Sequence, residues 1–105
     1  MTDIIEQIKE QLANNPVLLY MKGSPDFPQC GFSAKVVQIL GECEAQYASV
    51  NILADPELRE ALKSYSSWPT YPQLYINGEL VGGCDIVTDL YQQGELAKMI
   101  AAANA

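Results

Sequence analysis

Cys30 is the residue whose type and place in the sequence most directly suggest chemistry. It follows a loop with two prolines and a glycine, and it precedes a segment, 32–43, whose apolar residues recur at helical spacing. A side chain at the start of a helix faces unpaired backbone N–H groups and the positive end of the helix dipole. That environment favours the thiolate, the form that attacks disulfides and binds metal. The position therefore favours a functional thiol over a small buried core residue.

The neighbours of Cys30 narrow what its thiol can do. Ser33 stands where a Cys-x-x-Cys pair would have its second cysteine, and a hydroxyl cannot close a disulfide. A mixed disulfide on Cys30 must therefore be resolved by an external thiol, or else Cys30 serves as a metal ligand. Lys22, one of only six bases, is expected to end the preceding strand and face the same site. Gly31 would let a ligand approach the backbone closely.

The chain has three cysteines and no histidine. Without histidine, Cys/His hydrolases, Ser/His triads and most zinc sites are excluded. The odd number of cysteines argues against a structural disulfide framework, and their spacing argues against a metal held by this chain alone. Cys43 falls on the apolar stripe of its helix, where a core role is predicted. For Cys84, an inert thiol whose backbone alone is used remains one interpretation.

Charge and hydropathy limit the partners. The formal net charge is −7, from thirteen acids and six bases, so the chain repels phosphate backbones and anionic membrane surfaces. We therefore expect no nucleic-acid partner and no membrane partner. The apolar runs are far shorter than a membrane span. The N-terminus lacks the features of a secretory signal or a transit peptide, and a cytoplasmic location is the expectation.

The elements that would position Cys30 follow from the periodicity. A helix capped by Asp3, with Glu6 three residues later as in a capping box, is expected to end at 14–16. A fully apolar run at 17–21 predicts a buried central strand, and 47–52 predicts a second strand. Asp55 followed by proline starts another helix, whose predicted buried face is Leu58, Ala61, Leu62 and Tyr65.

The last part of the chain predicts a hairpin followed by two helices. Asn77-Gly78 between 73–76 and 79–81 is a specific signal for a two-residue hairpin turn. Asp85 is predicted to cap a helix ending near Gly94, and 96–103 to form a final helix. Alternating helices and strands followed by a hairpin predict one α/β domain, 1–105, with a four-stranded mixed sheet flanked by helices on both faces.

Five short blocks of this sequence stand in the order and spacing of the monothiol glutaredoxins. They extend over nearly the whole chain: Lys22-Gly23-Ser24-Pro25, Cys30-Gly31-Phe32-Ser33, Trp68-Pro69-Thr70, Tyr71-Pro72-Gln73 and Gly82-Gly83-Cys84-Asp85. The departures are conservative, with Ser24 where threonine is common and Tyr71 where phenylalanine also occurs. The sequence thus resembles a single-domain monothiol glutaredoxin, which implies a thioredoxin-like fold.

The resemblance implies a glutathione site built from residues of these blocks and of one helix. Lys22 and Arg59 are suited to the glycine carboxylate of glutathione. Asp85 can take the γ-glutamyl ammonium, while the N–H groups of Cys84 and Asp85 can take the γ-glutamyl carboxylate. Read alone, without the family, Arg59 and Lys63 could simply form a solvated helix face, and for Arg59 this is the favoured interpretation.

Further binding residues are implied by the same motifs. Pro72 would follow a cis peptide bond, which would turn the backbone of Tyr71 toward the cysteine of the tripeptide, as in an added strand. Phe32 and Gly83 complete the set carried over from the family. Trp68 is by default a packing residue, and the Gly82-Gly83 pair by default ends a strand.

Iron–sulfur chemistry is the function that the resemblance implies. A [2Fe–2S] cluster needs four ligands, usually thiolates, and one chain offers Cys30. The family implies a homodimer that bridges one cluster through two Cys30 residues and two glutathiones. It also implies storage of the cluster, delivery to iron–sulfur acceptor proteins and pairing with BolA-type proteins.

Three hypotheses therefore remain open. In the first, the protein is a cluster carrier and Cys30 is a cluster ligand. This hypothesis is favoured because position 33 is a serine and provides no resolving thiol next to Cys30. In the second, Cys30 is the nucleophile of a glutathione-dependent thiol-disulfide oxidoreductase, with Cys43 or Cys84 as a possible resolving thiol. In the third, the chain is a binding module and the thiol is incidental. Whether the protein is an enzyme is thus left open, with weak oxidoreductase activity as the expected form.

Overall fold

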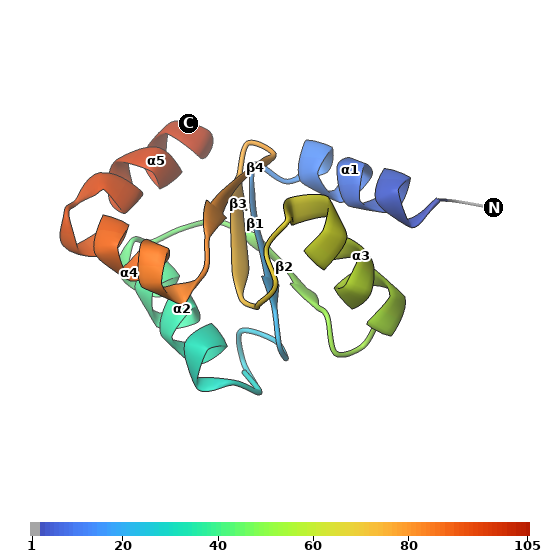
Figure 1. The fold of residues 1–105 in the computed structure, drawn as a ribbon. Helices are drawn as coiled ribbons and strands as arrows, with labels where there is room; N and C mark the ends of the chain where they lie inside the picture. The colour runs from blue at the N-terminus through green and yellow to red at the C-terminus, as the bar shows by residue number, and fades with distance from the viewer. Residues whose placement is uncertain (1–2) are drawn as a thin grey trace.

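The computed structural model describes residues 3–105, which form a four-stranded sheet between two layers of helices (Figure 1). In chain order the elements are α1 (Ile4–Asn14), β1 (Val17–Met21), α2 (Gly31–Glu42), β2 (Ala48–Asn51), α3 (Pro56–Ser66), β3 (Gln73–Ile76), β4 (Glu79–Gly82), α4 (Cys84–Gln92) and α5 (Glu95–Ala103). The strand order is β2-β1-β3-β4. Strand β1 pairs in parallel with β2, whereas β3 pairs antiparallel with both β1 and β4. The predicted mixed sheet is therefore confirmed.

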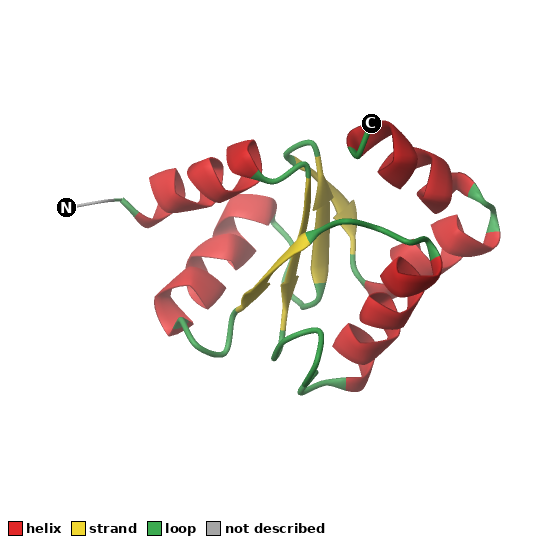
Figure 2. Ribbon diagram, turned by 180° about the vertical axis from the view of Figure 1, so that it is seen from behind, coloured by secondary structure: helices red, strands yellow, loops and turns green. Residues whose placement is uncertain are grey.

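Strand β1 lies at the centre of the sheet because all five of its side chains are apolar and all are buried. Successive side chains of a strand point to opposite faces. Val17, Leu19 and Met21 pack with α2, α4 and α5 on one face of the sheet. Leu18 and Tyr20 pack with α1 and α3 on the other face. Figure 2 shows the same two helical layers from behind. Strand β1 thus contributes side chains to both hydrophobic cores, one on each face of the sheet.

The helix caps predicted at Asp3 and Asp55 are confirmed. Asp3 accepts a hydrogen bond from the Ile5 amide at 3.2 Å, and Asp55 accepts one from the Leu58 amide at 3.1 Å. Asp3 bonds the second amide of α1, not the third. Its side-chain bond therefore differs from the capping box expected with Glu6.

Two details of the predicted helices are wrong. Helix α4 begins at Cys84 with Gly83 as its N-cap, so Asp85 lies in the first turn and does not cap it. The chain turns at Gly82, whose φ is 148°, and the helix starts immediately afterwards. Tyr65 is 38% exposed, because it lines a groove between α1 and the hairpin turn.

The hairpin is formed as predicted. Asn77 and Gly78 both have positive φ, 51° and 80°, as a two-residue type I′ turn requires. Strand β2 is slightly shorter than the predicted 47–52. None of the helices within 3–105 is both long and apolar enough to traverse a bilayer.

Candidate functional site

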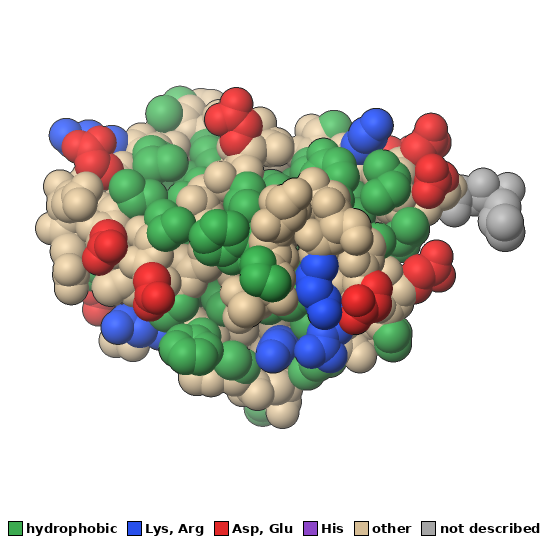
Figure 3. Space-filling model, viewed as in Figure 1, with side chains coloured by type: hydrophobic (Ala, Val, Ile, Leu, Met, Phe, Trp, Pro, Cys, Tyr) green, Lys and Arg blue, Asp and Glu red, His purple; other side chains and the backbone are tan. Residues whose placement is uncertain are grey.

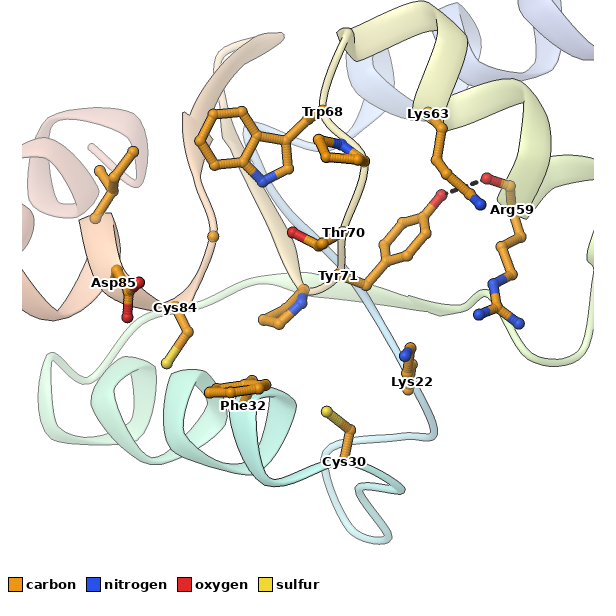
Figure 4. A pocket seen from close by; sticks show the side chains of 14 residues that line it. Lys22, Cys30, Phe32, Arg59, Lys63, Trp68, Thr70, Tyr71, Cys84 and Asp85 are labelled. Carbon is orange, nitrogen blue, oxygen red and sulfur yellow. Dashed lines mark hydrogen bonds between the residues drawn. The ribbon is translucent and has the colours of Figure 1, made fainter.

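A pocket of about 550 Å³ opens at one edge of the sheet (Figure 4), within the volume range of small-molecule sites. All nine residues predicted from the sequence line it: Lys22, Cys30, Phe32, Arg59, Tyr71, Pro72, Gly83, Cys84 and Asp85. The sequence prediction missed five further lining residues: Lys63, Trp68, Pro69, Thr70 and Ile86. The structure thus brings the predicted residues together, while their individual roles stay predictions.

The sheet explains why these distant segments meet. Strand β1 ends where the antiparallel β3 begins, since Tyr20 pairs with Gln73. Strand β4 ends at the same edge, since Gly82 pairs with Leu74. The segments that leave or enter these strands, together with the first turns of α2, α3 and α4, therefore surround one pocket.

Cys30 is the N-cap of α2, in extended backbone with φ −153° and ψ 138°. The pKa of its thiol is lowered, with the backbone N–H of Ser33 as the largest cause. Desolvation, the second-largest influence, raises this pKa, whereas the N–H of Phe32, the charge of Lys22 and the hydroxyl of Ser33 lower it further. The helix start favours the thiolate, as the sequence predicted, mainly because backbone amides face the sulfur.

Ser33 does more than take the place of a second cysteine. Its side chain is fully buried, and its Oγ accepts a hydrogen bond from the Lys22 amide at 3.2 Å. This bond joins the end of β1 to the first turn of α2, which fixes Lys22 beside Cys30. No local sequence pattern predicts this bond, because its two partners belong to separate elements.

The other two cysteines have different surroundings. Cys43 is the C-cap of α2 and packs against the core cluster, and its burial raises the pKa of its thiol. Cys43 thus packs at the border of the core and is only partly buried, which bears out the predicted core role in part. Cys84 is the first residue of α4 and lines the pocket, and Figure 4 shows its thiol pointing toward α2, near Phe32. All three cysteines are free.

One end of the pocket is positively charged. Lys22, Arg59 and Lys63 line it, and they are three of the six bases in the sequence. Figure 3 shows basic side chains gathered on this face. The Nε of Arg59 is buried without a hydrogen-bond partner, whereas Lys63 pairs with Glu60 at 3.2 Å. Arg59 is thus a pocket residue and does not belong to a plain solvated helix face.

The opposite end is formed by the start of α4. Asp85 is exposed there, in the first turn of the helix. The first amides of a helix have no intrahelical partner, so this end can receive an anion as well as a cation. A Cβ at Gly83 would lie 3.3 Å from both the Pro72 carbonyl oxygen and Trp68 Nε1, so a side chain there would require these neighbours to shift slightly.

The loop between these two ends is held by a buried amide. Gln73 is fully buried, and its Nε2 donates to the carbonyl oxygens of Trp68 at 3.1 Å and Thr70 at 3.2 Å. Its Oε1 accepts from the Tyr75 hydroxyl at 3.1 Å. The Tyr71–Pro72 peptide bond is cis, as the resemblance implied. Sequence reasoning missed Gln73, although a polar residue in an otherwise apolar strand was a visible signal.

The side chains of the described residues do not form a metal site by themselves. Within residues 3–105, no group of three or more His, Cys, Asp or Glu side chains is placed to hold a metal ion. Cys30 can supply one thiolate ligand at the pocket mouth. Any multinuclear centre would therefore need ligands from outside this chain.

Comparison of the sequence with known proteins finds glutaredoxins, both as a family model and as individual relatives. A family model described as Glutaredoxin matches residues 17–81. Glutaredoxin 4 of Escherichia coli (strain K12) is 56% identical over 105 residues, which cover 100% of this chain and 91% of the relative. Glutaredoxin 4 of Buchnera aphidicola subsp. Baizongia pistaciae (strain Bp) is 50% identical over 104 residues, covering 99% of this chain and 96% of that protein.

Solved structures agree with the fold. The solution structure of reduced poplar apo GrxS14 has a TM-score of 0.82 and 51% identity, covering 95% of this chain and 92% of that one. The mature form of Trypanosoma brucei 1CGrx1 has a TM-score of 0.84 and 35% identity, covering 100% of this chain and 72% of that one. The predicted thioredoxin-like fold is therefore confirmed.

Proposed function

This chain belongs to the glutaredoxin family and is of the monothiol type, and from that premise we propose that it binds glutathione beside Cys30 and carries a bridging [2Fe–2S] cluster as a homodimer. Its role is to store the cluster and to transfer it to acceptor proteins. The observation that carries the proposal is one pocket that joins a stabilised thiolate to a cationic end and to a helix N-terminus.

The charges of the pocket complement those of glutathione. The glycine carboxylate fits the end where the positively charged Lys22 and Arg59 line the pocket. The γ-glutamyl carboxylate fits the free amides at the start of α4, and the γ-glutamyl ammonium fits Asp85. The tripeptide's sulfur would then lie between these ends, on the side where Cys30 lines the pocket.

The cluster is the cargo, and this chain supplies one of its four ligands. Two Cys30 thiolates from two chains and two glutathione thiolates complete the set. Phe32 is 62% exposed at the mouth of the pocket, so the Cys30 side of the molecule is open to a second copy. Because two of the ligands are exchangeable small molecules, the cluster can pass to a protein with better ligands.

Transfer also requires receiving proteins. Iron–sulfur acceptor proteins and BolA-type proteins are the partners that this role implies, and the cytoplasm is the location that fits it. No nucleic acid and no membrane take part in this scheme.

Anaerobic reconstitution with iron, sulfide and glutathione tests the proposal. The native chain is expected to give a brown dimer, by visible absorption and analytical ultracentrifugation. Cys30→Ser should stay colourless and monomeric, and so should native chain without glutathione. Cys43→Ser is the matched control, because Cys43 packs against the core and should leave the cluster unaffected. Equal cluster uptake by native chain and Cys30→Ser would exclude the carrier role.

A second candidate is glutathione-dependent disulfide exchange, which the lowered pKa of Cys30 favours. The Cys30 thiolate would attack the glutathione sulfur of a glutathionylated protein and release that protein's thiolate. A second glutathione thiolate would then attack Cys30–S–S–glutathione, releasing the Cys30 thiolate and oxidised glutathione. Turnover of a glutathionylated peptide, coupled to glutathione reductase, measures this activity. Substantial turnover without cluster uptake would favour the oxidoreductase.

A further inference from the structure

The hydroxyl of Tyr71 joins the pocket loop to helix α3. Tyr71 is 6% exposed, and its hydroxyl donates to the backbone carbonyl oxygen of Arg59 at 2.6 Å (Figure 4). Burial raises the pKa of this phenol to about 12, so the group remains a neutral donor at physiological pH. A phenylalanine here would fill the same space and lose only this bond.

Arg59 is the residue that the bond holds. Its side chain lines the cationic end of the pocket, and its Nε is buried without a partner. A buried N–H that lacks an acceptor is costly, and a guanidinium offers several donors in a fixed fork. A carboxylate entering the pocket would bind the guanidinium that lines it, with a geometry that depends on where α3 places the fork.

We propose that the Tyr71 hydroxyl is a positioning group that fixes α3 at Arg59, so that the guanidinium selects ligands with a free C-terminal carboxylate. The inference rests on the proposed glutathione site, and it names what sets the site's selectivity. Tyr71 acts through Arg59 and does not itself contact the carboxylate through its hydroxyl.

Binding measurements on the full chain test this inference. Trp68 is the only tryptophan and lines the pocket, so its fluorescence can report on the occupant. The ligands are glutathione and glutathione monoethyl ester, which is blocked at the glycine carboxylate. The readout is the ratio of their dissociation constants. Tyr71→Phe should lower the preference for glutathione by roughly threefold, the size of one modest hydrogen bond.

Tyr20→Phe is the matched control. Tyr20 is also buried, and its hydroxyl donates to the Gln11 side chain on α1 at 2.7 Å, away from the pocket. The two variants lose the same chemical group, so a general loss of stability would affect both. Tyr20→Phe should leave the ligand ratio unchanged.

The variant Arg59→Gln separates the possible outcomes. It should reduce the preference to what Lys22 alone supplies, and adding Tyr71→Phe to it should change nothing further. Equal weakening of both ligands in Tyr71→Phe, or a ratio equal to that of Tyr20→Phe, would overturn the inference while leaving glutathione binding intact. If the native chain binds neither ligand, the proposed function itself is wrong.

Discussion

The sulfur of Cys30 is tuned chiefly by the backbone of the helix that follows it. The amides of Ser33 and Phe32 account for most of the lowering of its pKa, and the positive charge of Lys22 adds to it. Cys43 lies at the other end of the same helix, where burial and the Glu42 charge raise the pKa of its thiol. Two cysteines on one helix thus differ because their surroundings differ.

Alkylation of single-cysteine variants measures this difference. In the variant whose only cysteine is Cys30, the rate of alkylation by iodoacetamide should rise with pH. It should reach half its maximum at a pH below about 8.5, the ordinary pKa of a thiol. A lowered pKa means that the reactive thiolate predominates from a lower pH upward. Adding Lys22→Gln should move the curve to higher pH.

The variant with Cys43 alone provides the control for that experiment. Its alkylation curve should lie at higher pH, because its pKa is raised. A Cys30 curve that coincides with the Cys43 curve would contradict the assigned role of the helix start.

At the scale of elements, the loop after β1 depends on a glycine. Gly23 has a φ of 92°, and a Cβ there would lie 2.4 Å from the Phe27 carbonyl oxygen. Gly23→Ala should therefore destabilise the fold by about 1–3 kcal/mol, measured by urea unfolding. Gly41→Ala, within α2 and with open space around it, should stabilise it by about 0.5–1 kcal/mol. Equal effects of the two variants would refute this account of the loop.

The loop 68–72 depends in turn on Gln73. Gln73→Leu would leave the carbonyl oxygens of Trp68 and Thr70 without their donor. We expect urea unfolding to show a loss of about 1–3 kcal/mol for each buried group left unpaired. Gln92→Leu, on the exposed face of α4, should change stability by less than about 0.5 kcal/mol. A similar small change in Gln73→Leu would mean that the loop does not need this amide.

The elements were predictable where local physics determines them. The apolar run of β1, the cap at Asp55 and the turn at Asn77 depend on neighbouring residues alone, and all three are confirmed. The predictions failed where tertiary position decided the outcome. The start of α4 depends on the turn at Gly82, and the exposure of Tyr65 depends on where α1 lies.

The candidate site shows the same division. Its cysteine, charged residues and cis proline were predicted from motifs and from the chemistry of a helix start. Ser33 was missed because its bond to Lys22 joins two elements that only the folded chain brings together. Gln73 was missed although its partners, Trp68 and Thr70, lie within the preceding loop. Lys63 and Trp68 were not predicted as site residues, since packing and a solvated helix face were their simplest interpretations.

Across the whole molecule, positive charge is scarce and unevenly placed. The net charge is −7, and within residues 3–105 the ion pairs are two i,i+3 pairs, Lys63–Glu60 and Lys98–Glu95. Such partly or largely exposed pairs contribute little. Half of the bases line one pocket. Repulsion among the acidic side chains should therefore dominate the dependence of stability on salt concentration.

Added salt is accordingly expected to stabilise the protein. Between about 0.01 M and 0.1 M NaCl the Debye length falls from roughly 30 Å to 10 Å, which screens the repulsion. The urea midpoint should rise while the m-value stays constant. A midpoint that falls with salt would show that favourable ion pairs outweigh the net charge.

The pocket is assembled from segments that lie far apart along the chain, from 22–32 to 83–86. During translation, Cys30 is therefore synthesised well before the residues of α4 whose amides form the opposite end of the pocket. A nascent polypeptide halted ahead of residue 83 would carry the thiol without the α4 end of the proposed tripeptide site. Under the proposed function, selective capture of that small molecule begins only after residues 83–86 have been synthesised.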